Sequence, residues 1–440
     1  MRRIYLHTGF FIGLLCLVGL FVLSFFFRMI FPLAQLALFG FASLCLIDFL
    51  LVFTTRKGVT AQRQLPERLS NSDENLIEVY IKNLYSFPVY IQLIDEIPFQ
   101  FQKRDFEYTF FFKAGQEKCM QYYLRPTERG EYNFGKLNAF VYTPMRLFMK
   151  RYISCENAMV ATYPSFIQMK KFELIAFSQR LFDYGIKKIR KIGHTMEFEH
   201  IRDYVQGDDI RTINWKASSK RGQLMVNQYQ DEKSQHVYTL IDKGRSMYMP
   251  FEGLSLLDYA INTSLALTNI IIKKQDKAGI FTFSKKVEDR VVADRKASQM
   301  ERIMETLYRI ETDFKETDFS RLYSDINNTI KQRSLLMLYT NFETPNSLYR
   351  QLPFLKAIAK KHLLVVIFFQ NTELEQMLHK PSEHIQEVYD KVIAEKFSFE
   401  KRLIVQELTR HGIQCILTPP QELTLQSINK YLELKARGMI

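Results

Sequence analysis

The distribution of apolar positions divides the chain into three kinds of segment, and the first is continuously apolar. Residues 8–27 carry no charged side chain, and residues 32–53 carry only Asp48. Each run is long enough to cross the roughly 30 Å hydrocarbon core of a bilayer as a helix. Pro32 stands where the first turn of a helix tolerates a missing N–H group. The pattern predicts a transmembrane helical hairpin over residues 1–56, with spans at about 8–27 and 32–53.

Between residues 57 and 165 the apolar positions alternate with polar ones. Short runs rich in Val, Ile, Tyr and Phe are separated by turn residues, and they cover 76–83, 89–97, 108–115, 118–126 and 138–144. Alternation over short runs at this spacing is typical of an antiparallel β-sandwich. Residues 130–136 also have the glycine and lysine spacing of a phosphate-binding loop. However, Leu137 replaces the Ser or Thr that would ligate magnesium, so we predict a hairpin turn beside a strand there.

Beyond residue 235, apolar runs of strand length alternate with amphipathic helical segments. The predicted strands cover 237–242, 279–284, 287–293, 334–341, 363–370 and 413–419. Nearly continuous apolar strands separated by helices indicate a mainly parallel sheet with helices on both faces. The sequence therefore predicts a doubly wound α/β domain over residues 235–440. A connector over 166–234, basic and helical in its first part, joins it to the sandwich.

The basic residues near the apolar runs predict the orientation of the hairpin. Arg2 and Arg3 precede the first run, Arg56 and Lys57 follow the second, and Arg28 alone marks the turn. Because basic residues concentrate on the cytoplasmic side, both termini are expected there. The first run is too long for a secretory signal peptide and lacks a small-residue cleavage site. We predict a two-pass protein of the bacterial inner membrane whose large C-terminal region is cytoplasmic.

Charge and cysteine usage agree with that location. The formal net charge of +13 suits a protein held beside an anionic membrane surface, where membrane lipid is a partner. No nucleic-acid-binding motif accompanies the basic residues, so nucleic acid is not an expected partner. The five cysteines are scattered and form no C-x-x-C pair, which argues against a disulfide framework or a zinc ribbon.

A polar motif inside the connector predicts a pinned loop. Asp208 and Asp209 follow a glycine in a strong turn signal, and Arg202 and Arg211 flank them. Trp215, the single tryptophan, supplies a large apolar plate with one N–H donor. We expect the arginines to neutralise the carboxylates and the indole to clamp the loop. The network has either a partner-binding or a purely structural role.

The run RDYVQGDDIRTINWKAS resembles the signature of the domain of unknown function 58 family, which commonly has aspartate where this chain has Asn214. The resemblance extends over most of the chain. It implies that residues 235–440 form a von Willebrand factor A-like domain. It also implies a membrane-linked assembly role with a MoxR-type AAA ATPase and with other von Willebrand A or transglutaminase-like membrane proteins.

The same resemblance implies a metal-ion-dependent adhesion site at the strand ends, built from D-x-S-x-S, a threonine and an aspartate. Asp242 and Ser246 match this pattern, and Thr317 matches its threonine. Gly244 replaces a hydroxyl, however, and Asn341 stands in place of the aspartate. Losing one ligand and one negative charge weakens a site for a hard cation. The sequence therefore predicts a degenerate site that binds magnesium weakly or not at all.

Two basic residues beside Asp242 suggest a replacement for the cation. Lys243 and Arg245 could meet an acidic partner directly, which is a hypothesis. The leading interpretation is a membrane-anchored protein-interaction or assembly factor without catalytic residues or a certain cofactor. A metal-switched binding module with a functional magnesium site remains the first alternative. A membrane-associated hydrolase is the second, although the eight histidines show no arrangement with a nucleophile.

Overall fold

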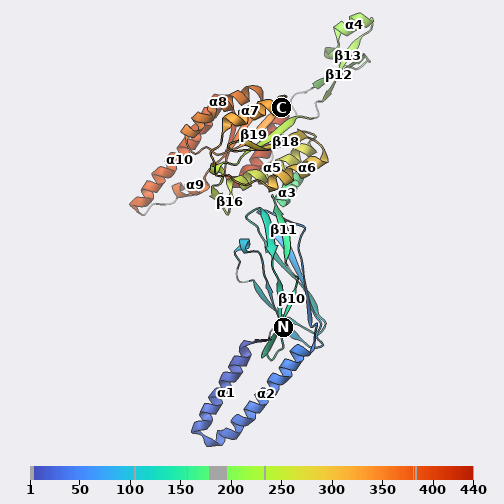
Figure 1. Ribbon diagram of the computed structural model, residues 1–440. Helices are drawn as coiled ribbons and strands as arrows, with labels where there is room; N and C mark the ends of the chain where they lie inside the picture. The colour runs from blue at the N-terminus through green and yellow to red at the C-terminus, as the bar shows by residue number, and fades with distance from the viewer. Residues whose placement is uncertain are drawn as a thin grey trace. The chain divides into compact units, whose positions relative to one another are not determined.

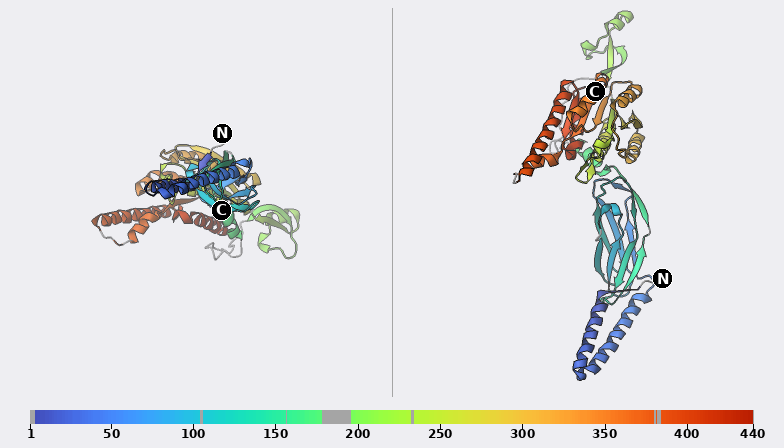
Figure 2. Two further views of the ribbon diagram at one scale, coloured as in Figure 1. Left: turned by 90° about the horizontal axis from the view of Figure 1, so that it is seen from below. Right: turned by 60° about the vertical axis from the view of Figure 1, so that its left-hand side comes forward.

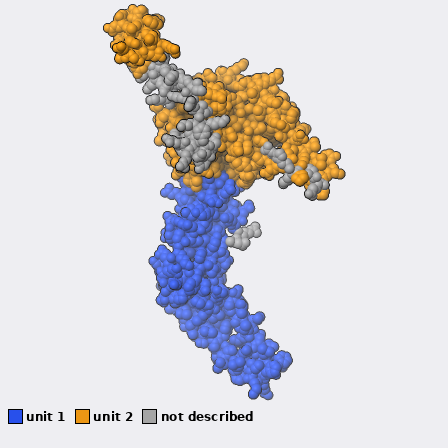
Figure 3. Space-filling view, turned by 180° about the vertical axis from the view of Figure 1, so that it is seen from behind, with its two compact units in different colours: residues 1–163 blue, residues 164–440 orange. Residues whose placement is uncertain are grey.

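The chain folds into two compact units, residues 1–163 and residues 164–440, which Figure 3 shows in different colours. The computed structural model describes residues 4–103, 106–155, 157–177, 196–231, 234–379, 381 and 384–439.

The first unit begins with two long apolar helices. Helix α1 spans Thr8–Phe26 and helix α2 spans Phe31–Thr54, joined by a short 3-10 turn at Arg28–Ile30. The two helices lie side by side as an antiparallel pair in Figures 1 and 2. Both are long and apolar enough to cross a membrane. The predicted pair of apolar helices is therefore confirmed.

The end of α2 is fastened to the β-rich part of the same unit by polar contacts. Asp48, the one charged residue of the second apolar run, is buried. Its carboxylate accepts hydrogen bonds from the Thr143 hydroxyl and from the Phe148 N–H, the latter at 2.9 Å. The Lys150 ammonium donates to the Thr55 carbonyl at 2.5 Å, just after the last turn of α2. Lys150 thus satisfies a carbonyl at a helix end, where backbone groups lack an internal partner, and Thr143 and Phe148 satisfy the buried Asp48 carboxylate.

Strand β1, Ile4–Leu6, ties the start of the hairpin to the same place. It pairs antiparallel with β10, Phe148–Ser154, so that Tyr5 lies opposite Met149. The chain thus leaves the β-rich region at α1 and returns to it after α2. Both ends of the helical hairpin are held by one body.

That body is sandwich-like, as predicted. One sheet has the order β1-β10-β9-β5-β6, and two smaller sheets have the orders β2-β4-β7 and β3-β11-β8. The remaining strands are β2 Val59–Gln64, β3 Arg68–Ser70, β4 Asn75–Asn83, β5 Val89–Asp95, β6 Glu107–Phe112, β7 Glu117–Leu124, β8 Gly130–Phe134, β9 Leu137–Tyr142 and β11 Ala158–Tyr163. Alternate residues of these strands point inward and share one apolar core, as a period of two requires.

A buried ion pair crosses this core. Arg63 of β2 pairs with Asp95 of β5, and each side chain is only 1% exposed. The Tyr122 hydroxyl donates to the same carboxylate at 2.6 Å, and Arg63 also donates to the Gly135 carbonyl at 3.0 Å. Burial raises the pKa of Asp95, and the neighbouring Arg63 opposes that rise. The sandwich therefore depends on a buried charge pair in which each side chain neutralises the other.

The glycines of residues 130–136 have a structural explanation. A side chain at Gly135 would place its Cβ 2.7 Å from an Oε2 atom of Glu96 and 2.8 Å from its Cβ. Strands β8 and β9 on either side of Gly135 belong to different sheets. The predicted hairpin turn was therefore wrong. The segment is a corner between two sheets, and close packing against Glu96 requires the glycine.

The second unit is built on a six-stranded sheet with the order β18-β17-β14-β19-β20-β21. Its strands are β14 His236–Asp242, β17 Lys277–Phe283, β18 Val287–Asp294, β19 Leu335–Tyr339, β20 Leu363–Phe369 and β21 Gln414–Thr418. Neighbouring strands are parallel except β18, which pairs antiparallel with β17 at one edge. The prediction of a mainly parallel sheet is confirmed.

Helices cover both faces of this sheet (Figure 1). They are α5 Leu256–Lys273, α6 Ala297–Tyr308, α7 Phe319–Thr329, α8 Pro345–Lys361, α9 Thr372–His379, α10 Ile385–Arg410 and α11 Leu423–Ala436. Helices α5, α6 and α11 contribute to one apolar core, and α7, α8 and α10 to the other. The short pair β15, Pro250–Phe251, and β16, Leu254–Ser255, follows β14.

Helix α3, Phe166–Phe177, belongs to the second unit rather than to a separate connector. Its residues Phe166, Met169 and Phe172 pack against the core that α5 helps to form. The Ser165 N–H donates to the Asn262 side chain of α5 at 2.9 Å. The compact unit thus begins at residue 164 and not at 235, because an apolar helix face outside the predicted domain completes its core.

Candidate functional site

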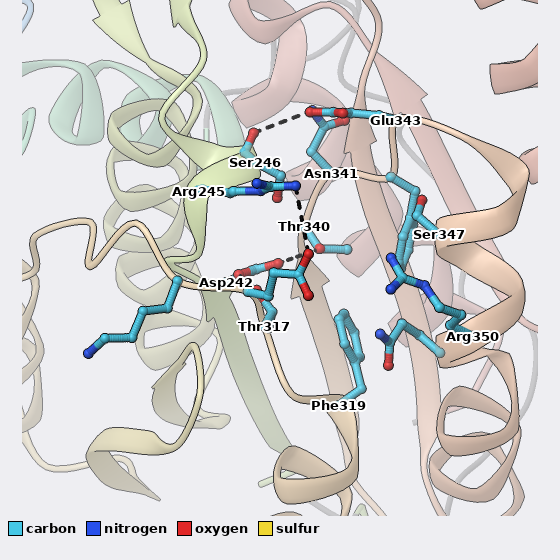
Figure 4. A pocket seen from close by; sticks show the side chains of 14 residues that line it. Asp242, Arg245, Ser246, Thr317, Phe319, Thr340, Asn341, Glu343, Ser347 and Arg350 are labelled. Atoms are coloured by element: carbon cyan, nitrogen blue, oxygen red, sulfur yellow. Dashed lines mark hydrogen bonds and ion pairs between the residues drawn. The ribbon is translucent and has the colours of Figure 1, made fainter.

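The candidate site lies where β14 and β19 end, at the carboxyl edge of the six-stranded sheet. Asp242, the last residue of β14, is 1% exposed. One oxygen of its carboxylate accepts from the Gly244 N–H at 2.8 Å and from the Thr317 hydroxyl at 2.6 Å. The other oxygen accepts from the Thr340 hydroxyl at 2.7 Å. Three protein donors therefore surround the carboxylate. Figure 4 shows the side chains of Thr317 and Thr340 beside it.

These contacts account for the electrostatics of Asp242. Burial raises the pKa of this carboxyl, and the hydrogen bonds from Thr317, Thr340 and Gly244 oppose the rise. The structure brings Asp242 and Thr317 together, in line with the sequence pattern. Thr340 was missed, although it directly precedes Asn341 at the end of a predicted strand. Alternation along that strand was the signal that could have shown which of the two side chains faces Asp242.

Gly244 explains the hydroxyl that the metal-site pattern lacks. A Cβ at this position would stand 2.3 Å from the Thr317 hydroxyl oxygen and 3.0 Å from the Lys315 carbonyl oxygen. The backbone φ of Gly244 is −68°, which any residue can adopt. The requirement is therefore one of space. The Thr317 hydroxyl occupies the volume that a serine side chain at residue 244 would need.

Replacing Gly244 with serine is therefore expected to lower the stability of the second unit without creating a magnesium site. Thr317 would have to move and lose its hydrogen bond to Asp242, at a cost of about 1–2 kcal/mol. Thermal unfolding of the full chain in detergent, with and without magnesium, measures this. Gly244→Ala is the control, because it adds the same clash without a hydroxyl. A magnesium-dependent rise in Tm for Gly244→Ser alone would contradict the prediction.

Ser246 and Asn341 lie on the same edge but make different contacts from those of a metal ligand set. The Asn341 side-chain amide approaches the Ser246 carbonyl at 3.5 Å. Its oxygen accepts from the Lys401 ammonium of α10 at 2.6 Å, and Lys401 also donates to the Phe342 carbonyl at 2.7 Å. The Lys401 ammonium thus binds the Asn341 oxygen, which in the metal-site pattern would face a metal cation.

The donor set does not fit a hard divalent cation. The residues of the metal-site pattern offer one carboxylate, Asp242, whose oxygens already accept three hydrogen bonds, together with hydroxyls and an amide oxygen engaged by Lys401. Magnesium requires near-octahedral oxygen coordination and favours carboxylates. Among the described residues, no group of three or more His, Cys, Asp or Glu side chains is placed to hold a metal ion.

The two basic residues beside Asp242 have different environments. Lys243 is buried, and its ammonium pairs with Glu288 of β18. It therefore holds the edge strand to the loop and is not available to a partner, which corrects the hypothesis for this residue. The Arg245 side chain is 70% exposed and lies 3.7 Å from Glu316, itself 70% exposed. Of the two, Arg245 is the one that can reach an acidic partner.

A small cleft opens beside these groups. It has a volume of about 120 Å³. Asp242 and Thr340 lie at its base. Four polar or charged residues also line it, namely Arg245, Glu316, and Ser347 and Arg350 of α8.

The predicted pinned loop forms a separate piece of the second unit. Strands β12, Met196–Asp203, and β13, Met225–Asp231, make an antiparallel hairpin that carries the short helix α4, Trp215–Arg221. The Arg202 guanidinium binds both oxygens of Asp208, at 2.9 and 2.6 Å. This pairing lowers the pKa of Asp208. The carboxylate also accepts from the Val205 N–H at 2.9 Å, which closes the turn.

The other members of the motif cap helices. Asp209 accepts from the Arg211 N–H at 3.0 Å, and Asn214 accepts from the Ala217 N–H at 3.0 Å at the start of α4. Trp215 is 68% exposed. The expected indole clamp was therefore wrong. The turn is fixed by an arginine, a capping aspartate and a capping asparagine, and Trp215 presents its ring on the surface.

Comparisons with known proteins agree with the motif. Residues 200–399 match the model of the family described as "Protein of unknown function DUF58". The "Uncharacterized protein YeaD" of Bacillus subtilis (strain 168) is 21% identical over 168 residues, or 38% of this chain and 39% of the relative. The match thus spans about two fifths of that relative.

Two solved structures show weaker likenesses. The crystal structure of the CARDB domain of the PF1109 protein from Pyrococcus furiosus is 16% identical, with 24% of this chain and 93% of that chain covered and a TM-score of 0.19. An aerotolerance-related membrane protein from Bacteroides fragilis NCTC 9343 is 14% identical, with 31% and 67% covered and a TM-score of 0.24.

The family match includes the Arg202 to Ser218 signature, the Asp242 loop and five of the six strands of the sheet. Residues 200–399 are therefore similar to the DUF58 family of proteins of unknown function.

Proposed function

We propose that this protein is a membrane-anchored protein-interaction module that docks a partner on the carboxyl edge of its six-stranded sheet. The observation that carries the proposal is the state of Asp242. Its carboxylate is satisfied by three protein donors, while Arg245 and Glu316 remain exposed above it. Such an edge is preformed and polar, and it needs no metal to hold its loops in place.

The position of the cleft supports a binding role. In open α/β sheets, ligands gather outside the carboxyl ends of the strands. Loops from β14 and β19, which are adjacent at the centre of the sheet, meet at the cleft. This strand arrangement supports a von Willebrand factor A-like domain, whose degenerate adhesion site would be the Asp242 loop. We assign the protein no enzymatic activity.

The two apolar helices would keep this module at a membrane. We propose that α1 and α2 cross the bacterial inner membrane, with the sandwich and the second unit on the cytoplasmic side. Because the chain leaves and re-enters one sandwich, a spanning hairpin places residues before α1 and after α2 on the same side of the bilayer. The basic residues that flank the hairpin favour the cytoplasm.

The family resemblance suggests a MoxR-type AAA ATPase as the partner, and the site suggests how it would bind. Arg245 can extend its guanidinium toward an acidic group, with which it forms bidentate hydrogen bonds. Reversing its charge would place a carboxylate beside Glu316 and repel the same group.

Arg245→Glu is therefore expected to weaken binding of the purified ATPase by roughly tenfold or more. The measurement is calorimetry with the full chain in lipid nanodiscs. Arg309→Glu is the matched control, because Arg309, the residue after α6, is 78% exposed and lies 3.9 Å from Glu305, much as Arg245 lies near Glu316. Equal binding by wild type and Arg245→Glu would reject this face. Failure of wild type to bind the ATPase would reject this partner.

A further inference from the structure

A second and larger hollow lies next to the cleft, on the other side of Asn341 and Glu343. Its volume is about 700 Å³. The segment after β14 contributes Met249 and, from β15, Phe251. The ends of β20 and β21 contribute Phe369 and Leu417, and α10 contributes Phe397 and Lys401. We call this hollow the Lys401 groove. It is mainly apolar in its lining, with a small number of charged groups.

Lys401 is the unusual member of this lining. Its side chain is partly buried, and its ammonium lies 5.7 Å from the centre of the Phe368 ring. The ammonium has three hydrogen-bond donors. The Asn341 side-chain oxygen and the Phe342 carbonyl accept from it, at 2.6 and 2.7 Å. Both acceptors are neutral.

No carboxylate of a described residue forms an ion pair with this ammonium. Glu343 acts on it electrostatically from a greater distance, and burial lowers the pKa of Lys401 to about 8. A charge that is withdrawn from water without a charged partner is costly, so an anion that entered the groove would relieve that cost. Arg402, Glu343 and Glu373 also line the groove and are exposed, so Lys401 is the charged group of the lining that is partly withdrawn from water.

We propose that the Lys401 groove binds an acidic segment of a protein partner, with a carboxylate on Lys401 and a neighbouring apolar side chain in the hollow. This inference rests on the proposed function, since it names the chemistry that the carboxyl edge recognises. The ammonium supplies the point charge and the apolar lining supplies the burial that gives affinity. The cation that completes this edge is thus provided by a helix far along the chain, and not by a metal or by Lys243.

The test is selection of a displayed random peptide library on the full chain in lipid nanodiscs. Wild type is expected to enrich peptides in which Asp or Glu lies within two residues of Phe, Leu or Met. Lys401→Met is expected to bind the enriched peptides at least about tenfold more weakly. Arg309→Glu should bind them as wild type does. Urea unfolding of each variant, followed by labelling of Cys415 in β21, establishes that the second unit is folded.

Other results would overturn the inference. They are a selection that enriches no acidic peptide, and enriched peptides that bind Lys401→Met as tightly as wild type. The proposed function fails separately. If Arg245→Glu loses the ATPase while Lys401→Met keeps it, the docking face stands and the Lys401 groove does not. If both variants keep it, the docking face itself is rejected.

Discussion

Replacement of Arg63 with methionine is expected to destabilise the sandwich by about 3–5 kcal/mol, because it leaves the Asp95 carboxylate buried without its cation. The difference in unfolding free energy between wild type and Arg63→Met should widen as pH rises from about 4 to 7. Without Arg63, the folded-state pKa of Asp95 rises further above its ordinary value of 3.8, which the unfolded chain retains. The unfolded chain then releases this proton first, so stability falls with rising pH.

Urea unfolding of the detergent-solubilised full chain measures this effect. Labelling of Cys155, a partly buried cysteine packed on the sandwich core, reports unfolding when the other cysteines are serine. Arg125→Met is the control, because Arg125 is exposed in the same sandwich and its loss should change stability by less than about 0.5 kcal/mol. Adding Asp95→Leu to Arg63→Met should recover part of the loss. Equal stability of Arg63→Met and Arg125→Met would contradict the account of the ion pair.

Asp242→Ala is expected to destabilise the second unit by about 3 kcal/mol. The Gly244 N–H and the Thr317 and Thr340 hydroxyls would lose their acceptor, at roughly 1–3 kcal/mol for each buried donor left unpaired. Removing a buried charge offsets part of this cost. The difference in unfolding free energy between wild type and Asp242→Ala should narrow as pH rises above about 4. Burial raises the pKa of Asp242 in the folded protein, so the stability that wild type draws from this carboxyl falls with rising pH.

The same urea experiment applies, with Cys415 as the reporter for the second unit. Glu316→Ala is the matched control, because it removes an exposed carboxylate from the same cleft and should cost less than about 1 kcal/mol. A deficit for Asp242→Ala that widens with pH, or that equals the deficit of Glu316→Ala, would show that the carboxylate does not organise the loops.

The hydrophobic pattern predicted most elements of the fold because each depends on local order. Apolar runs of sufficient length mark α1 and α2, a period of two marks the sandwich strands, and strand-length apolar runs mark the parallel sheet. Contacts between distant segments were not predictable in the same way. Helix α3 was assigned to a connector, since nothing in its own sequence shows that Phe166 and Phe172 pack against α5. The corner at Gly135 likewise depends on which sheet each neighbouring strand joins.

The candidate site shows the same division. Asp242 ends a predicted strand and Thr317 precedes a predicted helix. Their meeting at one edge of the sheet could therefore be expected. The role of Lys401 could not, because it lies within a long helix and reaches Asn341 only through packing of α10. Exposure also decides roles that residue type alone leaves open. By residue type, Lys243 suits a binding surface, yet it is buried against Glu288. Trp215 was expected to clamp the turn, yet its ring is exposed.

The pairing of β1 with β10 also sets an order of events during synthesis. Strand β1 leaves the ribosome first, but its partner β10 is made only after both apolar helices and most of the sandwich. Once α1 and α2 have packed together, β1 is held near the start of β2. Most of the entropy cost of closing the long loop between β1 and β10 has then already been met. Insertion of the hairpin into a bilayer would then act as an early folding step for the sandwich. The last strand to be secured in its five-stranded sheet would be the first one translated.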